Sequence, residues 1–391
     1  MTAPTAKAPA FFSPLEGLRG IAAVGVVLYH SWYHWQINGI GLIEHGNLFV
    51  DLFFVISGFV ISHIYISRLR ERRDLAQFAV LRTARLYPLH LFTLLVLAAY
   101  TLGSAWAQSA WGLSFTRMHA GLLANNTWTH FLENLLMLQA LLSPNTPSFN
   151  SPSWSISTEY FTYFIFALAV ILAARRGKLF LSMAAALALL SLGWLFQEGS
   201  LTRDERLLRC IGGFFSGALV YLAWVRFQPA LRRRLEGAPG HLAELAALAL
   251  AGTALWYCGE GRAQFLVLPC FALLVFLLAD GRGIVTRALR HRYIQNLGKW
   301  SYSIYMVHFT IILVMSDLAR VFWVRGPSTF MWWHLDRTLP LTLLLLTVVL
   351  LVASLTYRYI EDPPRRWAKR WVARHWGERP AEVPDAPIGA P

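Results

Sequence analysis

Long apolar runs separated by short charged segments dominate this chain of 391 residues. A helix needs roughly 17–25 mostly apolar residues to cross a bilayer, and ten runs reach that length. They lie at residues 15–36, 47–67, 78–102, 152–174, 179–197, 207–226, 241–258, 263–280, 296–316 and 338–360. The pattern therefore predicts an all-α polytopic membrane protein with about ten transmembrane helices.

The stretch 120–142 is an ambiguous case, because it mixes apolar residues with polar ones. It carries Asn125, Asn126, Glu133 and Asn134, which are expensive to place in hydrocarbon. We therefore expect this stretch to lie outside the membrane or to form a re-entrant segment.

The distribution of Lys and Arg predicts the orientation of the chain, because cytoplasmic loops carry an excess of these residues. With a cytoplasmic N-terminus, only eight of the 35 Lys and Arg residues lie in outer segments. Counting 120–142 as a further span would invert every later segment and destroy this asymmetry. The sequence thus predicts that both termini are cytoplasmic.

Composition supports the membrane assignment, since 56% of the residues are hydrophobic and only 14% are charged. These values exclude a disordered chain, a collagen-like repeat and a coiled coil, and they disfavour a soluble enzyme. The net charge of +14 lies in short loop clusters such as 68–73 and 232–234, which argues against a nucleic-acid-binding surface.

The chain is expected to form a single transmembrane domain over residues 1–376, followed by a disordered cytoplasmic tail over 377–391, rich in Pro and Ala. The N-terminus has one Lys and no short apolar core with a cleavage site, so it does not resemble a secretory signal. Cys210, Cys258 and Cys270 give neither a disulfide framework nor a CxxC metal spacing, and no metal is expected.

Ionisable residues inside the expected spans are the first candidates for function. Arg19 and His30 are eleven residues apart on the first span, so both side chains share one helix face. In the functional interpretation His30 is a base near mid-membrane. The alternative is that Arg19 extends to the interface and His30 is a packed core histidine, and the residues alone leave both open.

Arg82 and Arg85 begin the third span three residues apart, and together they form a fork suited to phosphate. The alternative is that they only mark the cytoplasmic side. His63 lies near the inner end of the second span, so Arg19, His63, Arg82 and Arg85 are expected to form an inner layer suited to an anionic cytosolic ligand.

A second, outer layer of polar residues is expected from depth. Glu159 and His30 both lie roughly 10 Å from the outer ends of their spans, which permits a Glu159–His30 pair. Ser155, one turn from Glu159, is expected to join it by a hydrogen bond. Asp51 is interpreted first as a helix cap and second as a substrate-side residue. His308 is either a satisfied core histidine or a further substrate-side residue.

Close helix packing is the expected role of one remaining pair. Ser57 and Gly58 are small residues in the second span, where they let a neighbouring helix approach.

Several ordered motifs resemble the acyltransferase-3 family of integral membrane acyltransferases. LEGLRGIAAVGVVLYH resembles its Arg-x10-His opening, and FVDLFFVISGF, RTARLYP, PSWSISTEYFTYF and GKWSYSIYMVH resemble later blocks in the same order. The resemblance covers about residues 13–310. It implies transfer of an acyl group, usually acetyl, from cytosolic acyl-CoA to a hydroxyl of a carbohydrate or similar acceptor, by a stand-alone member without an added extracytoplasmic domain.

The resemblance predicts an inner-membrane O-acyltransferase. His30 would be the catalytic base with Glu159 and Arg19 beside it, and Arg82, Arg85 and His63 would bind acyl-CoA. Asp51, Ser155 and His308 remain candidates on the substrate side. The alternatives are a glycolipid transporter or flippase and a non-catalytic membrane protein that binds acyl-CoA.

Overall fold

The computed structural model of the chain describes residues 12–35, 40–113, 115, 124–174, 176–201, 205–323 and 335–377. Within these ranges the chain is almost entirely helical and forms no strand. Apart from Gly377, the tail expected at 377–391 lies outside the described residues.

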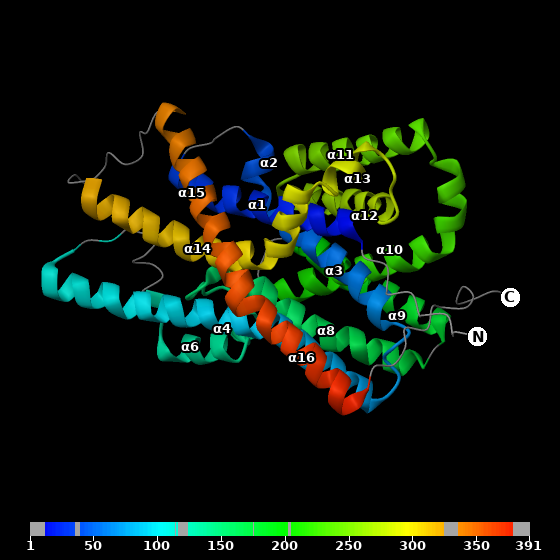
Figure 1. The fold of residues 1–391 in the computed structure, drawn as a ribbon, viewed down its shortest axis with the longest axis horizontal. Coiled ribbons are helices and arrows are strands. Elements are labelled where there is room, and N and C mark those ends of the chain that lie inside the picture. The colour runs from blue at the N-terminus through cyan, green and yellow to red at the C-terminus, as the bar shows by residue number, and fades with distance from the viewer. Residues whose placement is uncertain are drawn as a thin grey trace.

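Nine helices in the described ranges are long and apolar enough to cross a membrane, which confirms an all-α polytopic membrane protein (Figure 1). They are α3 (Phe49–Tyr65) with the turn η1 (Gly46–Leu48), α4 (Arg72–Trp111), α8 (Trp154–Ala173) with η2 (Ser151–Ser153), α9 (Gly177–Glu198), α10 (Arg206–Arg234), α11 (Ala238–Tyr257), α12 (Val267–Leu278) with η3 (Gly261–Leu266), α14 (Arg292–Trp323) and α15 (Leu335–Thr356) with its continuation. Every span expected between residues 47 and 360 has its helix here.

The first expected span forms α1 (Ser13–Trp35), which is not among these nine helices. Glu16, Arg19 and His30 lower its hydropathy. It packs along α14 and against α3, so neighbouring helices surround it (Figure 1). Short helices α2 (Gly41–Glu44) and α13 (Ile284–Leu289) adjoin it. The orientation of the termini stays a prediction.

The polar stretch at 120–142 does not form a spanning helix in its described part. It contains α6 (Trp128–Leu135) and α7 (Gln139–Leu142), which pack against α4 and α8. Asn134 is fully buried, and its side-chain amide donates to the carbonyl of His130 at 2.8 Å and to Ser148 Oγ at 3.1 Å. Internal hydrogen bonds therefore satisfy the amide nitrogen of Asn134, which lipid would leave unpaired.

The last helix continues beyond the expected end of its span at residue 360. A π-helical turn, η5 (Tyr357–Glu361), joins α15 to α16 (Asp362–Trp376), and Figure 1 shows the three as one long rod. The charged sequence after Tyr359 hides this continuation from an apolarity count. Pro363 and Pro364 do not end the helix, because the first turn of a helix tolerates proline.

The closest packing in the bundle joins α3 to α10, and it depends on two glycines. A Cβ atom on Gly58 would lie 1.8 Å from the carbonyl oxygen of Phe214. A Cβ atom on Gly217 would lie 2.0 Å from the carbonyl oxygen of Val55. Each glycine thus meets the backbone of the other helix, which confirms the expected close approach at Ser57-Gly58.

We expect Gly58→Ala to destabilise the folded protein by at least about 1–3 kcal/mol, because the new methyl group overlaps rigid backbone. The measurement is thermal unfolding in detergent together with the yield of monodisperse protein. Gly252→Ala in α11 is the matched control, since a Cβ there meets nothing within 4 Å. Similar unfolding midpoints for the two variants would contradict this packing.

Candidate active site

A cavity of about 100 Å³ lies inside the bundle, with lining residues from α1, α3, α4, α8 and α14. On α3 the lining residues recur three or four positions apart, as one helix face requires. The cavity brings together five of the predicted site residues: Arg19, Arg82, Arg85, Ser155 and Glu159. His30, His63, Asp51 and His308 are not in its lining.

Arg82 is held at the cavity by aromatic rings. Its guanidinium donates to the Tyr65 hydroxyl at 3.0 Å and lies 5.2 Å from the centroid of the Tyr65 ring and 5.8 Å from that of Tyr163. Its Nε is buried and has no hydrogen-bond partner among the described residues. Its Nε–H is therefore a buried donor that the described residues leave unsatisfied.

Arg85 has a counterion that the sequence interpretation missed. It forms an ion pair with Glu361 in η5, and Glu361 also accepts hydrogen bonds from Ser303 at 2.7 Å and Arg365 at 3.2 Å. The Glu361 side chain is fully buried. Glu361 lies one residue past the last expected span, so it was not counted among the ionisable residues inside the membrane. The prolines and arginines that follow it in the sequence gave no indication that it belongs to the site.

The third cavity arginine, Arg19, has no hydrogen-bond or ion-pair partner in the described part of the chain. It lies on α1, opposite the two arginines of α4. Three guanidinium groups thus line one cavity within the helix bundle, and such charges are expensive there without an anion.

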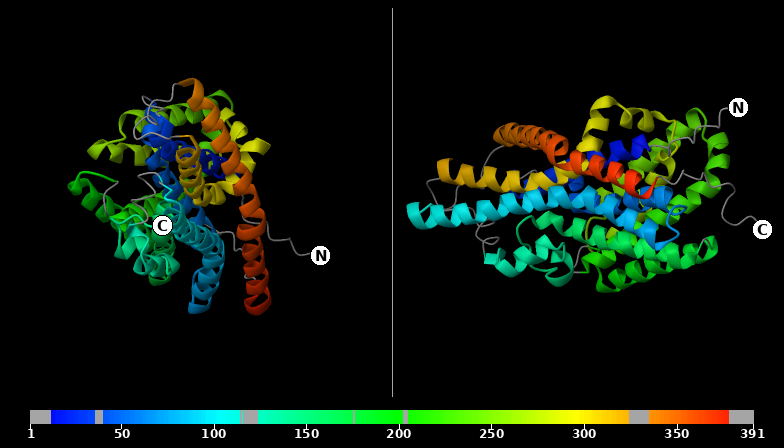
Figure 2. Two further views of the ribbon diagram at one scale, coloured as in Figure 1. Left: turned by 90° about the vertical axis from the view of Figure 1, so that its left-hand side faces the viewer. Right: turned by 60° about the horizontal axis from the view of Figure 1, so that its bottom comes forward.

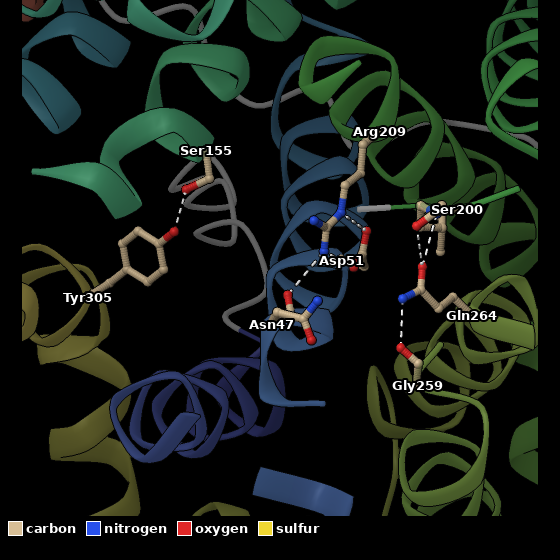
Figure 3. A network of polar contacts seen from close by, with 9 residues as sticks. Asn47, Asp51, Ser155, Ser200, Arg209, Gly259, Gln264 and Tyr305 are labelled. Carbon is tan, nitrogen blue, oxygen red and sulfur yellow. Dashed lines mark hydrogen bonds and ion pairs between the residues drawn. The ribbon is translucent and has the colours of Figure 1, made fainter. Parts of the chain in front are cut away.

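Glu159 is the carboxylate of the cavity lining. It accepts hydrogen bonds from Ser57 Oγ at 2.5 Å and from the Tyr163 hydroxyl at 2.6 Å, both to Oε1. Ser155 does not join it as expected, and donates instead to the Tyr305 hydroxyl at 2.8 Å (Figure 3). Glu159 Oε2 has no hydrogen bond in the described structure and is available to a ligand.

His30 and His308 form a hydrogen-bonded pair beside the cavity. His308 Nδ1 lies 2.6 Å from the carbonyl oxygen of Tyr305, so it must donate there, which leaves a lone pair on His308 Nε2. That nitrogen lies 3.2 Å from His30 Nδ1, which also lies 3.0 Å from the carbonyl oxygen of Val26. His30 Nδ1 therefore carries its proton, and His30 Nε2 is the nitrogen with the free lone pair.

The expected Glu159–His30 pair is thus wrong: in the described structure the partner of His30 is His308. An estimate of depth along each span could not fix the rotation of α8 about its axis. Tyr305 links the two groups, since it lines the cavity and its backbone carbonyl holds His308.

Asp51 does not cap α3, because Leu48 occupies the N-cap position and makes no side-chain cap. Instead Asp51 forms a buried, two-pronged ion pair with Arg209 of α10, with distances of 3.0 Å and 2.6 Å (Figure 3). Arg209 also donates to the carbonyl of Asn47 at 3.0 Å. The sequence interpretation counted Arg209 as an outer-loop charge and so missed this pair, which joins α3 to α10 away from the cavity.

His63 also lies elsewhere than expected. Its ring packs edge-on against Phe12, Tyr221 and Trp224, on the side of α3 that faces α10. His63 is six residues from Ser57, which turns it about 120° away from the cavity face of α3. Of the four residues in the predicted inner layer, Arg19, Arg82 and Arg85 line the cavity and His63 does not.

No group of three or more His, Cys, Asp or Glu side chains is positioned to hold a metal ion within the described ranges. The site consists of three cationic side chains, one carboxylate, several hydroxyls and an adjacent histidine pair.

Fold and site define a multi-pass membrane protein with a positively charged cavity inside its helix bundle. Comparison of the sequence with known families identifies it: residues 13–358 match the acyltransferase domain of the acyltransferase-3 family. The match covers most of the chain, and the protein belongs to this family.

Curated relatives carry related names. The chain is 24% identical over 385 residues to O-acetyltransferase OatA of Staphylococcus aureus, an alignment covering 92% of this chain and 58% of OatA. It is 25% identical over 384 residues to acyltransferase MdmB of Streptomyces mycarofaciens, covering 90% of this chain and 91% of MdmB. The chain thus spans little more than half the length of OatA. No solved structure matches it significantly.

Proposed function

We propose that the protein is an O-acyltransferase of the bacterial inner membrane. It moves an acyl group, most simply acetyl, from cytosolic acyl-CoA to a hydroxyl of a carbohydrate or glycoconjugate at the membrane or its outer face. Family membership and the names of OatA and MdmB support this activity. The multi-pass fold and the bacterial relatives support the location.

One observation carries the proposal: the cavity gathers Arg19, Arg82 and Arg85 around a single lining carboxylate, Glu159. Arg82 keeps an unpartnered buried nitrogen, and Arg19 forms no hydrogen bond or ion pair among the described residues, although Glu159 and Glu16 lie within Coulombic range of it. An excess of guanidinium groups in a low-dielectric site favours an anionic ligand, and planar guanidinium matches phosphate. The phosphates of acyl-CoA fit this description.

His30 is the proposed general base. Its free Nε2 would take the proton of the acceptor hydroxyl as the oxygen attacks the thioester carbon. The carbon–sulfur bond then breaks, and the departing thiolate takes the proton back from His30, which releases the CoA thiol. His308 fixes the ring of His30 through Nδ1, a task that Glu159 was first expected to perform.

Glu159 and Arg19 are proposed to act within the cavity. Glu159 Oε2 would accept a hydrogen bond from a neighbouring hydroxyl of the carbohydrate acceptor, while Ser57 and Tyr163 hold the other oxygen in place. Arg19 would stabilise the negative charge that develops on the thioester oxygen during attack. Ser155 and Tyr305 complete the polar lining on this side.

Arg82→Ala and Arg85→Ala are expected to weaken acyl-CoA binding, each by on the order of 1.5–3 kcal/mol, because each removes a charge-assisted contact to phosphate. Arg85→Ala should also lower the thermal unfolding midpoint, since Glu361 loses a buried partner. Titration of purified protein with acetyl-CoA measures both affinities. The exposed Arg262, which contacts the carbonyls of Phe196 and Gln197 and the ring of Phe196, provides the control Arg262→Ala. Unchanged affinity in both Arg82→Ala and Arg85→Ala would refute this donor site.

A further inference from the structure

Helix α16 runs antiparallel to the first half of α4, at the end of the molecule where the chain has its densest basic charge. At one end of the contact Arg85 of α4 pairs with Glu361, immediately before α16. At the other end Arg73 donates to the backbone carbonyl of Trp376, the last residue of α16. The right-hand view of Figure 2 shows the two helices side by side.

Two cations of α16 extend the cationic lining of the cavity. Arg365 is one turn after Glu361 and hydrogen-bonds to it, and Lys369 follows one turn later on the same face. Both lie within Coulombic range of Arg82 and Arg85. The strip from Glu361 to Lys369 is about 12 Å long at 1.5 Å per helical residue.

This strip contains more positive charge than its two carboxylates can balance, since Asp362 forms an ion pair with Arg366 of the same strip. Glu361 is shared between Arg85 and Arg365, and Arg82 and Lys369 have no ion-pair partner among the described residues. Like charges held this close repel each other, and the buried residues Ala368 and Val372 fix α16 in its position. An arrangement of this kind is stabilised when a polyanion bridges the four cations.

We propose that Arg365 and Lys369, continuing from Arg82 and Arg85, bind the nucleotide phosphates of the acyl donor. The inference rests on the proposed use of acyl-CoA. A 3′-phosphomonoester carries nearly two negative charges, and a diphosphate bridge adds about two more, which matches four cations. The donor would lie with its thioester at the cavity and its nucleotide along α16.

Substitutions on α16 test this site in full-length protein held in zwitterionic nanodiscs. Adenosine 3′,5′-bisphosphate, the nucleotide part of the donor without thioester, is the probe. Arg365→Gln and Lys369→Gln should each weaken its binding about tenfold, as the loss of one charged contact predicts. Arg370→Gln removes a charge that is exposed, as that of Lys369 is, one residue further along, and should leave binding unchanged.

Kinetics separate binding from a structural effect. Lys369→Gln should raise KM for acetyl-CoA about tenfold and leave KM for S-acetylpantetheine, which has no nucleotide, unchanged. An equal loss with both donors, an equal loss in Arg370→Gln, or a loss seen only when anionic lipid is added would each overturn the site. If bisphosphate binding depends on Lys369 but neither donor gives acetyl transfer, the phosphate site stands and the proposed function fails.

Discussion

His30→Ala should lower the turnover number for acetyl transfer by about 10²–10⁴, the contribution typical of a positioned general base. The reason is the tautomer fixed by the structure: with its proton on Nδ1 toward Val26 and His308, His30 presents a free lone pair at Nε2. Binding of acetyl-CoA should persist, because Arg82 and Arg85 are untouched. The measurement is kcat for the transfer reaction, with acetyl-CoA affinity determined in parallel.

His90→Ala is the matched control for this prediction. His90 is a buried histidine with a backbone partner, the carbonyl of Asn134 at 2.7 Å, and like His30 it is absent from the cavity lining. Unlike His30, it forms no hydrogen bond or ring contact with His308 or Tyr305 among the described residues. It should therefore lower stability without a comparable loss of kcat per folded molecule. Near-normal kcat in well-folded His30→Ala protein would remove His30 from the mechanism and leave Glu159 as the base candidate in the cavity.

The second large effect is expected in stability, at the Asp51–Arg209 pair. Both side chains are almost completely buried, with 1% and 5% of their surface exposed. Arg209→Met would leave the Asp51 carboxylate uncompensated in the bundle, and removal of one partner of a buried pair costs about 3–5 kcal/mol. Thermal or denaturant unfolding in detergent measures the change.

Two further variants test whether the loss of stability in Arg209→Met comes from breaking the charge pair. The double variant Asp51→Leu/Arg209→Met should recover most of the lost stability, because no lone buried charge remains. Arg232→Met removes another α10 arginine that forms an ion pair, but Arg232 and Asp280 are 46% and 29% exposed. That pair should contribute only about 0–1 kcal/mol. Equal losses from Arg209→Met and Arg232→Met would contradict the account.

The spanning helices were predictable because bilayer thickness imposes a minimum length on an apolar run. Nine expected spans each have a helix, although α4, α10 and α14 continue well beyond the expected ends, and the polar stretch around Asn134 was correctly kept out of the set. The end of the last span was missed. The π-helical turn and α16 continue the helix through charged residues, which are stable there because α4 packs against them.

The gathering of Arg19, Arg82 and Arg85 was predictable, because side-chain depth follows from counting residues along a span. Glu159 was expected in a separate outer layer, but it lines the same cavity as these arginines. Which neighbour a side chain faces depends on the rotation of each helix, and the helix–helix packing sets that rotation. For this reason Glu159 was paired with His30 instead of Ser57.

The same limit applies to the partners that lie far away in sequence. Asp51 meets Arg209 and Arg85 meets Glu361 only after the helices pack, so neither pair has a local sequence signal. Asp is a common N-cap residue, so an Asp near the start of a helix is naturally interpreted as a cap. The structure shows that the tight α3–α10 contact brings a guanidinium to it instead.

The central claim is that this protein transfers an acyl group from acyl-CoA to a carbohydrate hydroxyl. The direct measurement is incubation of purified protein in nanodiscs with acetyl-labelled acetyl-CoA and soluble glycans, peptidoglycan fragments or glycolipids. The account predicts a base-labile acetyl ester on one of these acceptors, one CoA thiol released per ester, and loss of both in His30→Ala. Acetyl-CoA that binds but gives no ester with any acceptor, or glycolipid that crosses the bilayer unmodified, would contradict it.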